Sequence, residues 1–367
     1  MAALDLPLPS AEHLAGLADL TLPEAFDART QWGEQCTTIG AVRNQARCGG
    51  CWAFGAVESF TDRRCIACAT ASASATAAAA AAAAAAGKPE PEKKKTNCTA
   101  ESEPMSTEYM IDCDTNDSGC SGGNLDDAWK FIVATGLPTE ACYPYRHYPG
   151  PPPPPPPPRC ESERDTNYAP VNKQIMTVGI DSHAECCQKC GGTPGCVLGV
   201  YQPPGLCHLK AAADIAGGPV AMPGYVSDRI APPGPPSPGQ DCPARCKDGT
   251  AVTTVKARTA YAVGPPGDVA AMQRELMAHG PFEVGFEVFS DFSSYKNGTY
   301  ARTASATGPI GGHAVKLVGW GTDAASGVPY WTIANSWTAD WGDDGFFKIR
   351  RGTNECGIEA TSAAGLP

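Results

Sequence analysis

The chain has 367 residues, of which 42% are hydrophobic, so it can bury a substantial core as two domains or as one domain with insertions. Its formal net charge is −11 at pH 7, and its only basic run is the short one from Lys93 to Lys95. This charge argues against nucleic acids and anionic membranes as partners, because such surfaces attract clustered Lys and Arg.

The sequence contains 18 cysteines, far more than proteins of a reducing compartment usually carry. We therefore expect a disulfide framework made in the secretory pathway, with a lysosome, a vacuole or the extracellular space as the destination. Three glycosylation sequons, at Asn97, Asn116 and Asn297, agree with this expectation. The opening segment MAALDLPLPSAEHLAGLADL has no basic start and no apolar core, so it is not a signal peptide. We expect that the amino terminus is incomplete.

The segment NQARCGGCWAFGAVESF, residues 44 to 60, predicts a helix, because apolar residues recur at helical spacing after its second cysteine. Two cysteines two residues apart, Cys48 and Cys51, stand where this helix begins. Such a pair can be a redox dithiol, half of a zinc site, or one structural cysteine beside one reactive cysteine.

The sequence favours the third alternative for this pair. A thioredoxin-type dithiol carries an aromatic residue before its first cysteine, whereas here Trp52 follows the second one. A zinc site needs a second pair of ligands, and the candidates belong to a separate cysteine-rich segment. Cys51 lies at the first turn of the helix, where the dipole and the unpaired N–H groups favour a thiolate. It therefore has the position of a nucleophile.

Residues 69–97 form a low-complexity insertion, nearly all Ala, Ser and Thr at first and then polar. We expect a surface excursion that is helical in part, since Ala has the best helix propensity. A membrane span is not expected, because Ala is only weakly apolar and because Cys68 and Cys98 bracket the segment closely.

A different kind of segment lies between eight prolines at 151–158 and the linker APPGPPSPGQ at 231–240. Its stretch HAECCQKCGGTPGCVLGVYQPPGLCHLK packs five cysteines into 28 residues, a density typical of a small module with a thin core. We expect a short helix with Cys186, Cys187 and Cys190, then a strand around Val197 to Tyr201, then a hairpin return through Cys207. The spacing resembles that of a PAN/apple module, a family that binds protein or carbohydrate. The alternative is a cysteine-rich loop without a binding role.

Downstream, DVAAMQRELMAHGPFEVGFEVF predicts a helix that ends at His279-Gly280-Pro281 and is followed by a strand. Further strands are predicted by HAVKLVGWG, PYWTIANSW and GFFKIRR. A helical half and a sheet-rich half indicate an α+β fold, with the chemistry between them.

A thiolate nucleophile needs a base, a group that orients the base, and donors for the oxyanion. Five histidines have simple structural explanations in tails, in the cysteine-rich segment or at a helix end: His13, His147, His183, His208 and His279. His313 differs, because it lies in the apolar strand segment GGHAVKLVGWG after two glycines. The nearby IANSW supplies Asn335 as an orienting partner, followed by Trp337 as a shield.

Several of these motifs together resemble the papain-like cysteine proteases: NQARCGGCWAFGA, CSGGN, GGHAVKLVGWG and YWTIANSWTADWGDDGFFKIRRG. LPEAFDARTQW, FSDFSSYKNGTY and ECGIEA resemble the cathepsin B branch. The resemblance implies a helical lobe and a β-rich lobe with a cleft between them. It also implies a domain order, which is a tail or pro-segment remnant at 1–21, protease at 22–159, the PAN/apple-like insertion at 160–230, the linker at 231–240 and protease again at 241–367.

The resemblance also implies roles for single residues. Cys51 is the nucleophile, His313 its general acid and base, and Asn335 the group that orients His313. Gln45, with the backbone N–H of Cys51, forms the oxyanion hole.

Four further residues resemble the substrate-binding positions of the family. Gly122 and Gly123 match the segment whose backbone pairs with extended substrate, and Trp337 borders the site. Thr361 stands where cathepsin B has the acidic residue that accepts Arg in the second subsite, so a basic preference is not implied.

The disulfides of the family, carried onto matching positions, imply the pairs Cys36–Cys65, Cys48–Cys120, Cys113–Cys242 and Cys142–Cys246. Cys68 and Cys98 then pair across the alanine-rich insertion. The module uses three bonds among Cys160, Cys186, Cys187, Cys190, Cys196 and Cys207. Cys51 and Cys356 are left free, as the mechanism requires of Cys51.

One departure from the family changes the expected activity. Cathepsin B holds the terminal carboxylate of its substrate with two histidines on an occluding loop, whereas the matching place after Cys160 reads ESERD. We therefore expect an endopeptidase with weak or no carboxydipeptidase activity. Its partners are peptide or protein substrates and a glycan or protein ligand of the module, with no cofactor, metal or membrane span, and the protein is expected to be a monomer. The alternative is a secreted binding protein that displays the module on a protease scaffold.

Overall fold

The computed structural model describes residues 4–85, 98, 100–146, 160–168, 176–179, 198–202, 206–210, 219–230 and 242–367, with the backbone alone for the strands between 160 and 230. The chain forms two compact units. One comprises Met1–Tyr148 and Ser237–Pro367, and the other comprises Pro149–Pro236.

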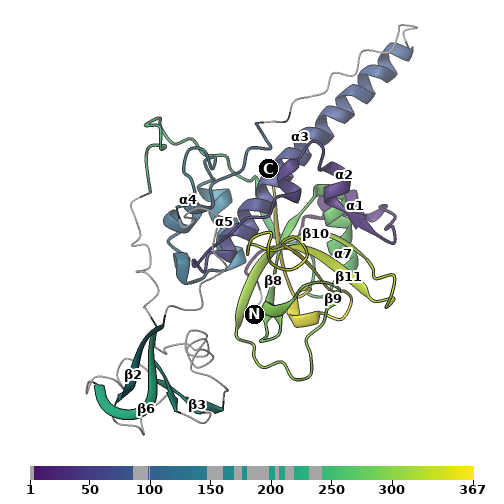
Figure 1. Ribbon diagram of the computed structural model, residues 1–367. Helices are drawn as coiled ribbons and strands as arrows, with labels where there is room; N and C mark the ends of the chain where they lie inside the picture. The colour runs from purple at the N-terminus through teal and green to yellow at the C-terminus, as the bar shows by residue number, and fades with distance from the viewer. Residues whose placement is uncertain are drawn as a thin grey trace. The chain divides into compact units, whose positions relative to one another are not determined.

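The helical part of the first unit is built around a single long helix (Figure 1). Its helices are α3 (Cys51–Ala85), α4 (Thr107–Cys113) and α5 (Leu125–Ala134). The first turns of α3 bury Trp52, Phe54 and Phe60 against Met110 of α4 and Trp129 of α5. This packing fixes the position of the start of α3, where Cys51 lies.

The alanine-rich segment continues α3 without a break as far as Ala85, so the expectation of partial helix is confirmed there. Figure 1 shows this end of α3 extending beyond the other helices of the unit. Residues 86–97 of the expected insertion lie outside the described residues. None of the helices in the described ranges has the length and hydropathy of a membrane span.

The β-rich part of the first unit is one eight-stranded sheet. Its path is β7-β13-β8-β10-β11-β12-β9, with β1 added beside β10, and all its pairs are antiparallel except that between β12 and β9. The strands are β1 (Phe26–Asp27), β7 (Thr259–Ala262), β8 (Phe282–Val288), β9 (Thr299–Tyr300), β10 (Gly311–Thr322), β11 (Pro329–Ala334), β12 (Phe346–Arg350) and β13 (Thr361–Leu366). Phe286, Leu317 and Phe347 lie in its core.

Shorter elements complete the first unit. They are the α-helices α1 (Ala11–Ala18), α2 (Ala28–Trp32) and α7 (Val269–His279), and the 3-10 helices η1 (Thr37–Gly40), η2 (Gly119–Ser121), η4 (Phe292–Ser294) and η5 (Glu355–Gly357). The helix α7 ends at His279, as its sequence predicts, and Gly280 follows with φ of 88°, a value that favours glycine. A helical part and a largely antiparallel sheet confirm the α+β class.

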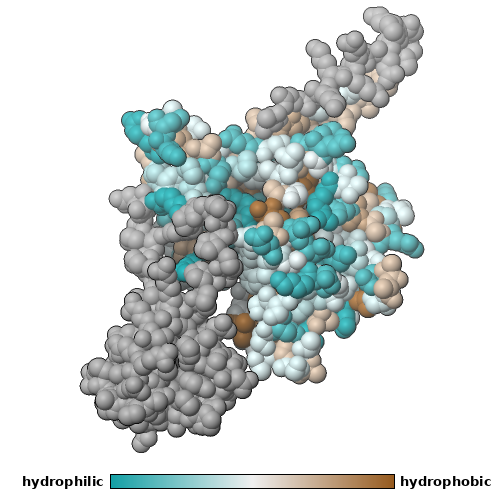
Figure 2. All heavy atoms as spheres, viewed as in Figure 1, coloured by the Kyte–Doolittle hydropathy of each residue, from teal (hydrophilic) through white to brown (hydrophobic). Residues whose placement is uncertain are grey.

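The viewed surface of the first unit is mostly polar. Figure 2 shows mostly hydrophilic and neutral residues on the viewed face, with apolar side chains in small scattered groups. Among the described residues the exposed large hydrophobic side chains are Leu8, Leu14, Val255 and Ile310. Scattered apolar side chains of this kind are usual on a globular protein.

The second unit contains a five-stranded antiparallel sheet in the order β2-β6-β4-β5-β3. Its strands are β2 (Cys160–Tyr168), β3 (Met176–Gly179), β4 (Leu198–Gln202), β5 (Leu206–Lys210) and β6 (Pro219–Ile230). The strand expected around Val197 to Tyr201 matches β4, and the return through Cys207 matches β5. The helix expected to carry Cys186, Cys187 and Cys190 lies outside the described residues.

Four disulfides join cysteines of the described residues. They are Cys36–Cys65, Cys48–Cys120, Cys68–Cys98 and Cys142–Cys246. The side chains of the six cysteines in the second unit are not described.

The expected pair Cys113–Cys242 requires a correction, because both residues are free thiols in the structure. Burial, followed by the nearby Cys242 thiol, raises the pKa of the Cys113 thiol. The two cysteines therefore face each other as thiols, with Cys113 buried at the end of α4 and Cys242 exposed. Cys51 and Cys356 are also free.

Candidate active site

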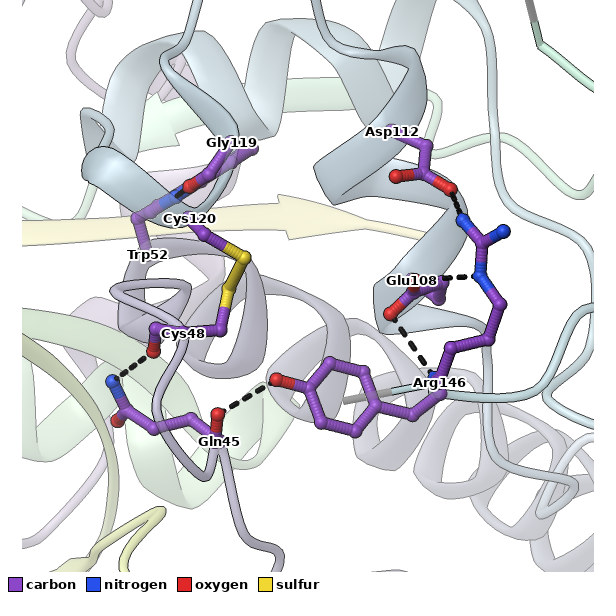
Figure 3. The surroundings of a disulfide bond; sticks show 9 residues. Gln45, Cys48, Trp52, Glu108, Asp112, Gly119, Cys120 and Arg146 are labelled. Atoms are coloured by element: carbon purple, nitrogen blue, oxygen red, sulfur yellow. Dashed lines mark hydrogen bonds and ion pairs between the residues drawn. A yellow bond between two sulfur atoms is a disulfide. The ribbon is translucent and has the colours of Figure 1, made fainter. Parts of the chain in front are cut away.

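Cys51 begins α3 after a loop that is held in place by a disulfide and by two glycines. The Cys48–Cys120 disulfide joins this loop to η2 (Figure 3). The Gly49 N–H donates to the carbonyl of Cys120 over 2.8 Å, and a Cβ at Gly49 would lie 2.6 Å from that oxygen. The close approach requires glycine, so the sequence CGGC sets where the thiol of Cys51 lies.

His313 lies on β10 with 4% of its surface exposed. Its Nε2 is 2.8 Å from Oδ1 of Asn335, the residue that follows β11. That oxygen also accepts the backbone N–H of Ser336 over 2.9 Å. Because a carbonyl oxygen only accepts, Nε2 of His313 carries the hydrogen, and its Nδ1 is the nitrogen that can take a proton.

Aromatic rings surround the imidazole of His313. The indole of Trp337 stacks on it, with ring centroids 4.8 Å apart and an interplanar angle of 23°. Phe286 of β8 meets the imidazole edge-on at 5.7 Å. These rings keep water away from the hydrogen bond between His313 and Asn335, which strengthens that bond.

Cys51 lies close to the strand that carries His313, because the backbone N–H of Ala314, the residue after His313, lowers the pKa of the Cys51 thiol by hydrogen bonding to its sulfur. Burial raises the pKa of the Cys51 thiol, and the bonds to backbone groups oppose this effect. Burial lowers the pKa of His313 to about 4, and the bond to Asn335 opposes it. Each group alone therefore favours its neutral form. A proton transferred from Cys51 to His313 creates two opposite charges that stabilise each other, with the thiolate at a helix amino terminus.

Glu283 on β8 is a buried carboxyl group close enough to Cys51 to interact with it electrostatically. Burial and then the Cys51 charge raise the pKa of Glu283 well above its ordinary value. Its Oε2 accepts a hydrogen bond from Nε1 of Trp129 over 3.0 Å. A neutral carboxyl at this place adds no negative charge that would oppose a thiolate.

The side-chain amide of Gln45 is fixed at both ends. Its Nε2 donates to the carbonyl of Cys48 over 2.9 Å, and its Oε1 accepts the hydroxyl of Ser336 over 2.6 Å. These two bonds set the orientation of the amide and leave one hydrogen on Nε2 for a further acceptor. Ser336 was not predicted from the sequence. The feature that could have indicated it is a hydroxyl residue directly after Asn335 in IANSW.

Tyr145 supports the same loop and was not predicted either. Its hydroxyl donates to the backbone carbonyl of Gln45 over 2.7 Å, and its ring meets Phe54 edge-on at 5.0 Å. The next residue, Arg146, is paired with Glu108 and Asp112 of α4, as Figure 3 shows. The segment before the inserted unit is thus joined both to α4 and to the loop of Gln45.

The glycines predicted to face substrate follow η2 and lie against the start of α3. Gly122 has φ of 120°, and a Cβ at Gly123 would lie 2.5 Å from the ring of Trp52. Trp52 in turn donates from Nε1 to the carbonyl of Gly119 over 3.0 Å. Both positions therefore require glycine.

Thr361 lies at the start of β13. It is buried and pairs with Gly285 of β8, the residue before Phe286, which contacts His313. The described residues contain one group of three side chains that could hold a metal ion, His13, Glu275 and His279, and none of the predicted catalytic residues belongs to it.

Comparisons with known proteins agree with this geometry. The sequence profile of the papain family cysteine proteases matches residues 22–81, 71–190 and 184–366. The cathepsin B-like cysteine proteinase 6 of Caenorhabditis elegans is 33% identical over 369 residues, which cover 99% of this chain and 72% of the relative. Cathepsin B-like cysteine proteinase 4 of the same organism is 33% identical over 348 residues, or 95% and 76% of the two chains.

Two solved structures share the fold. The procathepsin B S9 of Trypanosoma congolense has a TM-score of 0.58 at 23% identity. The match covers 99% of this chain and 83% of the procathepsin B chain. The digestive procathepsin L 3 of Tenebrio molitor has a TM-score of 0.51 at 17% identity. The match covers 100% of this chain and 75% of the procathepsin L 3 chain. With the family profile and the two relatives, these matches show that the chain belongs to the papain family of cysteine proteases and is cathepsin B-like.

Proposed function

We propose that this cysteine protease cleaves internal peptide bonds with Cys51 as the nucleophile and His313 as the general acid and base. The observation that carries the proposal is the buried 2.8 Å bond between His313 Nε2 and Asn335 Oδ1. This bond leaves Nδ1 of His313 as the basic nitrogen. Ala314, the next residue on the same strand, contacts the thiol of Cys51.

Acylation of the enzyme begins with transfer of the Cys51 proton to Nδ1 of His313. The thiolate attacks the carbonyl carbon of the scissile peptide bond, and the carbonyl oxygen becomes an oxyanion. The free Nε2 hydrogen of Gln45 and the backbone N–H of Cys51 stabilise this charge. His313 then gives its proton to the leaving amine as the C–N bond breaks, which leaves a thioester on Cys51.

Deacylation uses the same groups in reverse. Neutral His313 takes a proton from a water molecule, and the resulting hydroxide attacks the thioester carbonyl. The thiolate of Cys51 leaves, and the acid product departs. Throughout both steps Asn335 holds the imidazole ring in one orientation, and Trp337 shields the bond that does so.

Gly122 and Gly123 are proposed to pair with the backbone of an extended substrate. The close packing of Gly123 against Trp52 supports this role, because a rigid backbone edge costs little entropy on binding. Thr361 offers no negative charge, so no preference for a basic residue in the second subsite is proposed.

The endopeptidase character is proposed from the sequence ESERD, where carboxylates stand in place of the imidazoles of cathepsin B. Like charge repels the terminal carboxylate of a substrate. The test uses one peptide as its free acid and as its carboxy-terminal amide, with product analysis by mass spectrometry. We expect internal cleavage of both forms at similar rates. Rapid release of dipeptides from the free acid alone would contradict the proposal.

The unit Pro149–Pro236 is proposed to recruit substrate as a PAN/apple-like module that binds a glycan or a protein. Its separate five-stranded sheet supports an independent binding role. Replacing residues 161–241 by a short Gly/Ser linker should leave hydrolysis of small peptides unchanged and slow the cleavage of large or glycosylated substrates, since recruitment raises the effective concentration. Equal loss on both, or no change on either, would count against recruitment.

We further propose that the protease works in a lysosome, in a vacuole or outside the cell. The four disulfides among the described residues support an oxidising route of synthesis.

A further inference from the structure

Three side chains with metal-binding groups meet where α1 lies beside α7. Nε2 of His13, on α1, is 2.7 Å from Oε2 of Glu275, on α7. Nδ1 of His279, one turn after Glu275, is 3.3 Å from Oε1 of the same carboxylate. One potential ligand atom from each side chain lies within 4.8 Å of the other two.

The carboxylate of Glu275 is completely buried and firmly oriented. Its Oε1 accepts bonds from Arg63 over 2.8 Å and from the hydroxyl of Tyr261 over 2.7 Å. Arg63 forms an ion pair with this carboxylate, and the other oxygen, Oε2, points to His13. Ligating carboxylates are held in just this way by outer hydrogen bonds.

A nitrogen of His279 is only weakly satisfied at this place. Its Nδ1 is buried and, apart from the 3.3 Å contact with Oε1 of Glu275, has no hydrogen-bond partner among the described groups, although 30% of the side chain is exposed. The imidazoles of His13 and His279 lie with centroids 4.7 Å apart and a tilt of 30°. The Oε1 that this nitrogen faces already accepts bonds from Arg63 and Tyr261, so a metal ion would satisfy the nitrogen better than this long contact does.

We propose that His13, Glu275 and His279 bind a divalent transition-metal ion, with Zn²⁺ as the best fit. Two imidazole nitrogens and one carboxylate oxygen are ligands that zinc prefers, and the exposed side of His279 leaves room for water as the fourth ligand. Zinc ligands at about 2.0 Å lie roughly 3.3 Å from one another, so the observed atoms need only small side-chain rotations to close on an ion. The positive charge of Arg63 weakens the site, and micromolar affinity is expected.

The ion would fasten α1 to the β-rich part of the unit. His13 is 262 positions from Glu275 in the sequence, so the site closes a long loop of chain. Without a metal, the same contacts form an ion pair. The experiment below distinguishes a metal site from an ion pair alone.

The test measures binding of Zn²⁺ and Co²⁺ to the full-length protein by titration calorimetry at near-neutral pH, after removal of metal with a chelator. We expect one site, and for Co²⁺ the absorption bands of a tetrahedral ion with nitrogen and oxygen ligands. His13→Ala and His279→Ala should each weaken binding by at least about 10-fold, whereas His208→Ala, a histidine of the other unit, should not.

Thermal unfolding supplies the second readout. Saturating Zn²⁺ should raise the melting temperature of the wild type and of His208→Ala, but not of His13→Ala or His279→Ala. His13→Gln, which keeps a polar group, serves in place of His13→Ala if the latter unfolds. Absence of binding up to about 100 μM, or equal affinity in all variants, would overturn the proposal and leave the ion pair alone.

Discussion

Replacing Ser336 by alanine should slow catalysis through Gln45, although Ser336 itself contacts no substrate in the proposed mechanism. The hydroxyl of Ser336 donates to Oε1 of Gln45 over 2.6 Å, and both residues are buried. Without that donor, Oε1 keeps no partner among the described residues. The amide can then rotate, and its free N–H no longer points to where the oxyanion forms.

The structure sets the size of this effect. A buried acceptor that loses its donor costs about 1 to 3 kcal/mol, which corresponds to roughly 5- to 150-fold. Complete loss of one oxyanion donor costs about 100- to 1,000-fold in kcat, which is the upper limit for an effect that acts through Gln45. We therefore expect Ser336→Ala to lower kcat by about 5- to 100-fold with little change in KM, because the oxyanion exists only in the transition state.

The assay measures kcat and KM on a fluorogenic peptide for the wild type, for Ser336→Ala and for the control Ser326→Ala, whose hydroxyl bonds only within an exposed turn. A double mutant makes the test decisive. In a Gln45→Ala background, Ser336→Ala should cost nothing further, because both act through one donor. Wild-type kcat in Ser336→Ala, or an undiminished loss in the Gln45→Ala background, would show that Ser336 does not act through Gln45.

Three further predictions concern the same site. Asn335→Ala should lower kcat by about 10- to 100-fold, less than removal of Cys51, because Asn335 orients His313 and does not react; loss as large as that of Cys51→Ala would contradict this. Tyr145→Phe should lower kcat by about 2- to 10-fold through the loop of Gln45, and an unchanged kcat would show that its hydroxyl is not needed. As pH falls, kcat/KM should drop with an apparent pKa of about 4, since protonated His313 cannot accept the Cys51 proton; a midpoint above about 6 would disagree.

Much of the fold could be predicted from local patterns. The periodicity after Cys51 predicts the start of α3, and HAVKLVGWG, PYWTIANSW and GFFKIRR correspond to β10, β11 and β12. Hydrophobic spacing reports these elements because each buries one face against its neighbours. Pairing of cysteines is less secure, since two thiols can lie close together without forming a disulfide, as Cys113 and Cys242 illustrate.

The residues that sequence reasoning missed are linked by contacts between distant positions. Ser336 and Gln45 are 291 positions apart, and Tyr145 and Gln45 are 100 apart. His13 looked like part of a tail, yet it bonds to Glu275 on α7. Composition and spacing describe a segment and its neighbours, whereas these hydrogen bonds arise only when the tertiary fold brings the segments together.

Covalent labelling by a peptidyl epoxide inhibitor tests whether Cys51 is the nucleophile. Such inhibitors alkylate a thiolate that a bound peptide places next to the epoxide. The protein offers an internal control, because Cys113, Cys242 and Cys356 are free thiols in the same chain.

Mass spectrometry of the digested adduct identifies the modified cysteine, and the residual rate on a fluorogenic peptide reports activity. We expect one adduct per chain, on Cys51, with complete loss of activity, and no adduct in Cys51→Ala. An adduct on another cysteine with loss of activity, or full activity after Cys51 is labelled, would contradict this expectation.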